Sequence, residues 1–253
     1  MISIFSRNWV LSNIETVLFD KDGTLIDLHY FWGKMTEMRA MEVIRRFSID
    51  KKHFETICEF LGYNTKTGKM YPNGITALYS RVKIIEIFKE NLKEIGISTT
   101  KEEITQIFDD VAEEFYKEAE KYTLLIKDAF KFAVDLHSKG IKIGIVTSDS
   151  GEATKLTLKK LGLEGLFDVI IGRESSTETK ESGGLTKIAL KELGADPTTT
   201  LMIGDAPMDA ISAQNAGIEK TILVATGQVE ANELENYSLY VVNSFRKLNC
   251  LKI

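Results

Sequence analysis

The stretch TVLFDKDGTLID, residues 16–27, joins a short apolar run to three acidic residues grouped around a glycine. The run has the length and composition of a buried strand in a parallel sheet, and the interior of such a strand does not accommodate carboxylates. Asp20, Asp22 and Asp27 are therefore expected where the chain leaves the sheet. In open α/β sheets, ligands bind at the carboxyl ends of the strands.

Four further apolar runs, bounded by turn residues, alternate with helical patterns in the second half of the chain. This alternation is typical of βαβ units that build a parallel sheet. The helical patterns end in glycine, which readily takes a left-handed conformation after a helix. The candidate strands are IKIGIVT (141–147), FDVIIG (167–172), TLMIGD (200–205) and TILVAT (221–226).

Residues 29–126 show a helical period throughout, apart from the turn-rich segment NTKTGKMYPNG at 64–74. We interpret the apolar stripes as core packing of a helical bundle. The fold class expected is α/β, with a core of residues 1–28 and 127–253 and a helical insertion of residues 29–126 after the first strand. The stripes are Phe31, Met35, Met38 and Met41; Phe54, Ile57, Cys58 and Leu61; Leu78, Val82, Ile85 and Leu92; and Ile104, Phe108, Val111 and Phe115.

Composition narrows the possible partners. The chain has 253 residues, 43% of them hydrophobic, and its 32 basic and 37 acidic residues give a formal charge of -5 without a basic run, which argues against nucleic acid as a partner. Polar residues interrupt the N-terminal segment, so it predicts neither a signal peptide nor a membrane span. Cys58 and Cys250 lack metal-like spacing and suggest reduced thiols. We expect a soluble cytoplasmic protein with no membrane partner; composition leaves its oligomeric state open.

Polar side chains follow three of the predicted strands. Each set has a local explanation as a turn, a helix cap or an acidic first helical turn. Their common position at strand ends favours one site, because these ends share an edge of a parallel sheet. Close carboxylates suit a hard cation such as Mg²⁺, and a hydroxyl beside free helical N–H groups suits a phosphate. The three sets are Asp20 with Asp22, Thr147 with Ser148, and Asp205 with Asp209.

The segments FDKDGTLID, IVTSDS and IGDAPMD resemble the first, second and fourth motifs of the haloacid dehalogenase-like hydrolases. The third motif of this family is a lysine upstream of the fourth. Lys180 lies 25 residues before Asp205, the spacing found in members similar to phosphoglycolate phosphatase, whereas Lys187 falls on the following helix. Glu181 stands where the family commonly has proline, which affects the expected shape of the loop.

The resemblance implies a Rossmann-like core with a mobile helical cap inserted between the first two motifs. It also implies a reaction in which Asp20 attacks phosphorus and Asp22 moves protons to and from oxygen. Thr147 and Ser148 would bind phosphoryl oxygens, and Lys180 would offset their charge. Mg²⁺ would be held by Asp20, the backbone carbonyl of Asp22 and Asp205, with Asp209 in a supporting role.

The expected activity is therefore hydrolysis of a small phosphorylated metabolite, resembling phosphoglycolate or a sugar phosphate. In this family Asp22 is equally compatible with a mutase similar to β-phosphoglucomutase, whose cap supplies a histidine; here that position is Trp32, and His29 comes too early. A third reading is a phospho-aspartate switch similar to receiver domains, which are shorter and lack a helical insertion. Lys69 and Tyr71, in the turn-rich segment of the insertion, are candidates for contacting the substrate.

Overall fold

The structure, a computed structural model, describes residues 1–252 and consists of two compact units. The core unit combines Met1–Asp27 with the chain from Leu125 onward, and the helical unit is Leu28–Leu124. These boundaries differ from the expected ones by one residue at the first junction and by two at the second. Within the core, the two connections are paired, because Ile26 bridges Leu125 and the N–H of Ile126 donates to the carbonyl of Leu25.

The core contains a six-stranded parallel sheet with the strand order β10-β9-β8-β3-β6-β7. This sheet confirms the predicted α/β class. Strand β3 lies between β6 and β8, and all residues of β3 and β8 are buried, which explains why both read as uninterrupted apolar runs. The strands are β3 (Thr16–Phe19), β6 (Lys142–Val146), β7 (Val169–Ile171), β8 (Thr200–Gly204), β9 (Lys220–Val224) and β10 (Tyr240–Val242).

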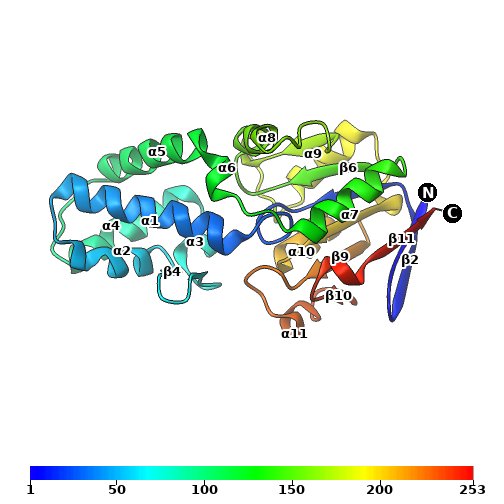
Figure 1. Cartoon of the computed structure of the whole chain (residues 1–253), viewed down its shortest axis with the longest axis horizontal. Helices are drawn as coiled ribbons and strands as arrows, with labels where there is room; N and C mark the ends of the chain where they lie inside the picture. The colour runs from blue at the N-terminus through cyan, green and yellow to red at the C-terminus, as the bar shows by residue number, and fades with distance from the viewer. Residues whose placement is uncertain (253) are drawn as a thin grey trace. The chain divides into compact units, whose positions relative to one another are not determined.

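Helices of the core cover the sheet (Figure 1). Apolar side chains of α9 and α10 pack on Leu18, Val146 and Met202 from the strands. Gly194 follows α9 in the left-handed region with φ 55°, as expected for a glycine after a helix. The core helices are α7 (Lys127–Ser138), α8 (Gly151–Lys160), α9 (Gly184–Leu193), α10 (Pro207–Asn215) and α11 (Ala231–Leu234), with short 3-10 turns at Arg173–Ser175, Pro197–Thr199 and Phe245–Lys247.

Two parts of the core were not predicted. Strand β10 adds an edge to the parallel sheet, and the chain ends form a separate antiparallel sheet of β1 (Ile2–Ser6), β2 (Trp9–Ile14) and β11 (Asn249–Lys252). The two ends of the chain lie side by side in Figure 1. Pairing between residues so far apart in sequence has no local signature, and for that reason the sequence analysis did not find it.

The helical unit is built mainly from three long helices. Its core includes Ile57, Ile85 and Phe108, as the apolar stripes predicted. The turn-rich segment contains a small hairpin, β4 (Tyr63–Asn64) and β5 (Lys69–Met70), where a loop was expected. The helices are α1 (Leu28–Phe47), α2 (Phe54–Phe60), α3 (Ile75–Leu78), α4 (Arg81–Glu94), α5 (Lys101–Lys117) and α6 (Ala119–Tyr122), with a 3-10 turn at Lys51–His53.

Three residues of the predicted stripes are exposed and correct the interpretation of those positions. Met41 is 45% exposed, because repeated steps of three residues drift around a helix with 3.6 residues per turn and carry position 41 off the buried face of α1. Leu78 and Val82 are 58% and 70% exposed, since they lie at the end of the four-residue α3 and in the first turn of α4, where few neighbours surround them.

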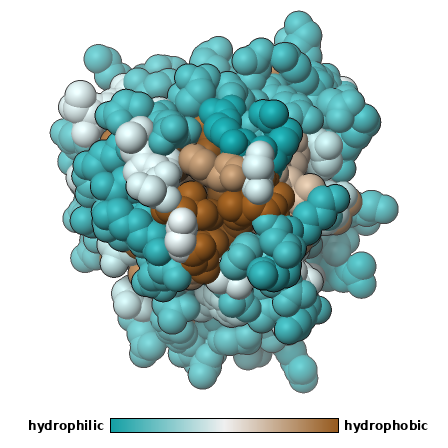
Figure 2. All heavy atoms as spheres, turned by 90° about the vertical axis from the view of Figure 1, so that its left-hand side faces the viewer, coloured by the Kyte–Doolittle hydropathy of each residue, from teal (hydrophilic) through white to brown (hydrophobic). Residues whose placement is uncertain are grey.

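Apolar side chains also gather on one end face of the helical unit (Figure 2). Helices α1 and α4 end there and α2 begins there, and the partly buried Phe47, Ile49, Phe54 and Ile95 pack against the buried cluster beneath them. These side chains close that end of the helical core. Within residues 1–252, no helix has both the length and the apolar character needed to cross a bilayer.

Candidate active site

Three adjacent strands deliver polar residues to one edge of the core sheet. Asp20 directly follows β3, Thr147 follows β6 and Asp205 follows β8, and each is buried. The N–H of Asp20 donates to the carbonyl of Ile203 at 2.8 Å, so the ladder between β3 and β8 extends to the acid itself. Because the strands are parallel and adjacent, their carboxyl ends bring these side chains together.

Lys180 reaches the same place from the loop before α9. Its Nζ lies 2.5 Å from Oδ1 of Asp20 and 2.6 Å from Oδ1 of Asp209. Burial works to lower the pKa of Lys180, but the two carboxylates outweigh it and raise that pKa, so the ammonium stays charged. Lys187 is exposed on α9. The structure thus brings Lys180 to the acidic residues.

Asp209 is held by its own helix. Its Oδ2 accepts hydrogen bonds from the backbone N–H groups of Asp205 and Ala206, both at 3.1 Å, at the start of α10. Its Oδ1 faces Lys180. A Cβ at Gly204 would lie 2.1 Å from the Asp209 carboxyl carbon, so the glycine allows this close approach. Asp209 is therefore placed to hold the lysine against Asp20.

Carboxylate oxygens of Asp20, Asp205 and Asp209 lie within 4.8 Å of one another, a grouping that could hold a metal ion. Burial raises the pKa of Asp205 well above its ordinary value, and the charges of Asp20 and Asp209 raise it further. Burial likewise raises the pKa of Asp20 to about 7, against the opposing effect of Lys180. Buried oxygens that repel one another suit a hard divalent cation, which relieves the repulsion.

The Asp22 carboxylate is not in that cluster. Its Oδ1 lies 2.9 Å from Nζ of Lys21. Burial raises the pKa of Asp22, while the charge of Lys21 opposes the shift. A raised pKa favours the protonated carboxyl group, which is the form from which a general acid donates.

The hydroxyl of Thr147 accepts a hydrogen bond from the backbone N–H of Asp149 at 3.1 Å, which leaves its proton to donate. Ser148, the second predicted phosphate-binding residue, is exposed. In the helical unit, Lys69 is exposed, and the hydroxyl of Tyr71 accepts a hydrogen bond from Nδ2 of Asn64 at 2.8 Å. Of the two hydroxyl residues predicted to bind phosphate, Thr147 is therefore the buried one.

Two glycines surround Asp205, and neither was among the predicted site residues. A Cβ at Gly227 would lie 1.7 Å from its Oδ2, and a Cβ at Gly23 would lie 2.3 Å from the same atom. Thr226 donates from Oγ1 to the carbonyl of Gly23 at 2.5 Å and joins the two backbones. Gly227 comes shortly after β9, which is a fourth parallel strand. This position in the sequence could have indicated that Gly227 lies at the same edge of the sheet.

If the carboxylate cluster holds a metal ion, replacing Gly227 with alanine should raise the metal concentration needed for half-maximal binding at least about tenfold, because the new methyl group displaces Asp205. The measurement is a titration of metal-dependent thermal stabilisation with Mg²⁺. Gly162→Ala is the control for adding a methyl group without a clash, since its Cβ would meet nothing within 4 Å; its φ of 71° strains alanine, so thermal unfolding must show that both variants are folded. An unchanged Mg²⁺ requirement in Gly227→Ala would contradict the role given to this glycine.

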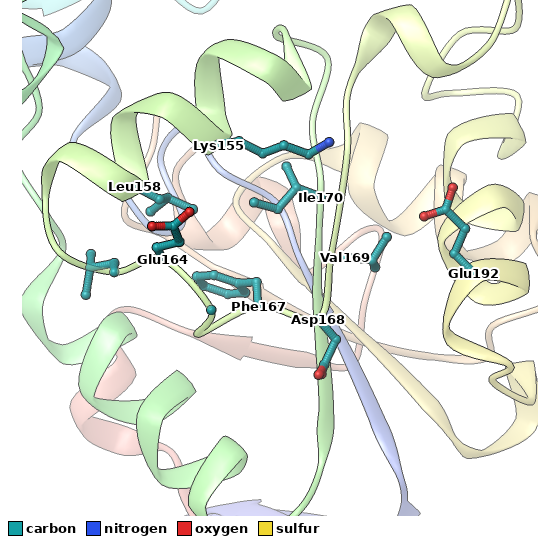
Figure 3. Close-up of a pocket in the computed structure, with 10 residues that line it drawn as sticks. Lys155, Leu158, Glu164, Phe167, Asp168, Val169, Ile170 and Glu192 are labelled. Carbon is teal, nitrogen blue, oxygen red and sulfur yellow. The ribbon is translucent and has the colours of Figure 1, made fainter.

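A cavity of about 320 Å³ lies elsewhere on the core, along the edge strand β7 (Figure 3). Its lining includes Phe167 and Asp168, which precede β7, and Ile170 within it. Lys155 and Glu164 also line it. None of the predicted site residues does, so the acidic site is distinct from this cavity.

Comparisons with known proteins show the family of the chain. The model of the haloacid dehalogenase-like hydrolases matches residues 14–217. A Clostridium perfringens protein, provisionally named pyrophosphatase PpaX, is 31% identical over 81% of this chain and 81% of its own length. The phosphoglycolate phosphatase of Aquifex aeolicus is 27% identical over 87% and 88% of the two chains.

A solved structure shares the fold. It is a protein of Haemophilus somnus predicted to be a phosphoglycolate phosphatase, with a TM-score of 0.70, 16% identity, and coverage of 93% of this chain and 96% of that one. The family match spans the strands that carry Asp20, Thr147 and Asp205 as well as the loop of Lys180. The chain belongs to the haloacid dehalogenase-like hydrolases.

Proposed function

We propose that this hydrolase is a Mg²⁺-dependent phosphatase that cleaves a small phosphorylated metabolite through an aspartyl phosphate on Asp20. The observation that carries the proposal is the contact between buried Lys180 and Asp20 beside the carboxylates of Asp205 and Asp209. A lysine and a cation site flanking one carboxylate provide positive charge where a phosphoryl group would be transferred. Because this positive charge lies beside Asp20, the arrangement favours Asp20 as the nucleophile over the other carboxylates of the site.

The chemistry assigned to the residues proceeds in two steps. A carboxylate oxygen of Asp20 forms a bond to phosphorus as the ester P–O bond breaks, and Asp22 gives its proton to the departing oxygen. Water then attacks phosphorus and gives a proton to Asp22, which releases inorganic phosphate and restores Asp20. Thr147 donates its hydroxyl proton to a phosphoryl oxygen, and Lys180 offsets the charge on the transferred group.

The metal site proposed uses carboxylate oxygens of Asp20 and Asp205 with the backbone carbonyl of Asp22. Asp209 stays in its supporting role, because its oxygens already face two N–H groups and Lys180. A bound Mg²⁺ supplies positive charge that stabilises the phosphoryl oxygens during transfer.

The substrate class we propose is a small anionic phosphate. The relatives are named for pyrophosphate and phosphoglycolate, both of which are small and highly charged. The test is phosphate release from a panel of 2-phosphoglycolate, pyrophosphate and sugar phosphates, with p-nitrophenyl phosphate as a general probe. Failure to release phosphate from any of these in the presence of Mg²⁺ would refute the proposed function.

The structure supports phosphatase over mutase chemistry. His29, the histidine of the helical unit nearest in sequence to the expected mutase position, accepts a hydrogen bond on Nδ1 from the N–H of Met70 at 3.1 Å. That contact ties its ring to the hairpin of its own unit. Membership of a hydrolase family also disfavours the phospho-aspartate switch.

We further propose that the helical unit is a mobile cap and that the protein acts in the cytoplasm. The junction after Asp27 follows Asp22 by five residues, so movement there would be transmitted to the catalytic loop. The unpaired thiols of Cys58 and Cys250 suit a reducing compartment.

If the hairpin of the helical unit selects the substrate, Lys69→Ala and Tyr71→Phe should each lower kcat/KM several-fold more for the best metabolite of the panel than for p-nitrophenyl phosphate. A generic ester gains little from contacts with a cap. Lys83→Ala, which removes a half-exposed lysine from α4, is the matched control. Equal changes for the two substrates would show that selection lies elsewhere in the helical unit.

A further inference from the structure

Lys21 is a buried cation that the proposed reaction does not use. It lies between Asp20 and Asp22 in the loop after β3, and 5% of its surface is exposed. Its Nζ donates to Oδ2 of Asp149 at 2.8 Å and lies 2.9 Å from Oδ1 of Asp22. One ammonium therefore contacts the proposed general acid and a second carboxylate 128 residues away.

Asp149 joins this contact to the loop after β6. It is 5% exposed, and its backbone N–H donates to Oγ1 of Thr147. Its carbonyl accepts the N–H of Arg173 at 3.0 Å, which anchors the loop to the next strand connection. Burial alone would raise the pKa of Asp149, but the charge and hydrogen bond of Lys21, together with the backbone N–H of Ser150 and the charge of Arg173, outweigh burial and lower that pKa. Lys21 is thus held from a rigid part of the core.

A gain in folding stability does not explain the buried ion pair of Lys21 and Asp149. Taking two charges out of water is costly, and well-packed apolar residues of similar volume often stabilise a core equally well. The position between the two strand ends instead suits the alignment of a neighbouring group. Asp22 is that neighbour.

Two of the acids in the site, Asp209 and Asp22, are held in different ways. Asp209 accepts two backbone hydrogen bonds, whereas Oδ1 of Asp22 is buried and accepts none, although Lys21 lies 2.9 Å from it. The charge of Lys21 at 2.9 Å is therefore the contact that holds the Asp22 carboxylate in place.

We propose that Lys21, anchored by Asp149, is a positioning residue that aligns Asp22 for proton transfer to the leaving oxygen. The inference rests on the proposed phosphatase function. The buried ion pair of Lys21 and Asp149 would then affect one step only, the cleavage of the ester bond. Leaving groups that need a proton should depend on it most.

The test compares three substrates whose leaving oxygens need protonation to different degrees: glycerol 2-phosphate, phenyl phosphate and p-nitrophenyl phosphate. Because kcat/KM covers the steps through ester cleavage, it reports the proton transfer. In Lys21→Met, kcat/KM should fall at least about tenfold more for glycerol 2-phosphate than for p-nitrophenyl phosphate, with phenyl phosphate between them. Lys21→Arg should recover part of the loss for glycerol 2-phosphate.

Lys21→Met leaves Asp149 buried without this partner. The double variant Lys21→Met/Asp149→Leu is therefore measured as well, because it removes both charges and restores apolar packing. Thermal unfolding identifies the folded variants. The graded loss in either folded variant supports the proposal, and equal losses for the three substrates overturn it. Lack of turnover by the wild-type protein on all three and on the metabolite panel would instead overturn the phosphatase function itself.

Discussion

Asp20→Asn is expected to lower kcat by about 10⁴-fold or more, the scale of loss when a covalent nucleophile is removed. Asparagine keeps the shape of the side chain but lacks the anionic oxygen that would attack phosphorus. The change also removes one of the charges shared among Asp20, Asp205 and Lys180. The measurement is single-turnover and steady-state phosphate release at saturating Mg²⁺ and substrate.

Asp128→Asn is the matched control. Asp128 lies in the first turn of α7 and pairs with the exposed Arg246, so its loss should change kcat by no more than about twofold. Thermal unfolding of both variants shows that they are folded. If folded Asp20→Asn kept more than a small fraction of wild-type kcat, the covalent mechanism would be wrong.

Removal of divalent metal is expected to have an effect of similar size. Chelation with excess EDTA should abolish turnover, and added Mg²⁺ should restore it, because in the proposed reaction buried Asp20 and Asp205 would face a phosphoryl group that is itself anionic. Ca²⁺ should restore activity poorly, since it is larger and accepts irregular coordination. The measurement is phosphate release across titrations of each ion into chelated protein.

A second readout separates binding from catalysis. Mg²⁺ should raise the melting temperature of the chelated protein, because an ion that binds only the folded state stabilises it, and Asp205→Asn should weaken that shift. EDTA already saturated with Mg²⁺ controls for effects of the chelator itself. Undiminished turnover in excess EDTA would remove the metal from the mechanism.

Local patterns predicted much of the core. Strand β3 was expected at its observed bounds, and β6, β8 and β9 differ from the predicted runs by one or two residues at their ends. Such runs are readable because central strands of a parallel sheet are buried on both faces. The family resemblance, through the spacing of its third and fourth motifs, also indicated Lys180, whose Nζ lies 2.5 Å from Oδ1 of Asp20.

Other features depend on neighbours that are distant in the sequence. Met41 fits a stripe of apolar residues yet faces solvent, because only the packing of α1 decides which side of the helix is covered. Strands β1 and β11 are at opposite ends of the chain, and neither has a strand pattern that would identify its partner.

The sequence by itself determined the fold class, the family resemblance and the acids at the strand ends, because apolar runs and short motifs are local properties of a chain. Only the tertiary structure showed that Gly227 leaves room for Asp205 and that Lys21 pairs with Asp149. Both features depend on atoms from separate strand ends meeting within a few ångströms. The folding of the parallel sheet alone produces that proximity.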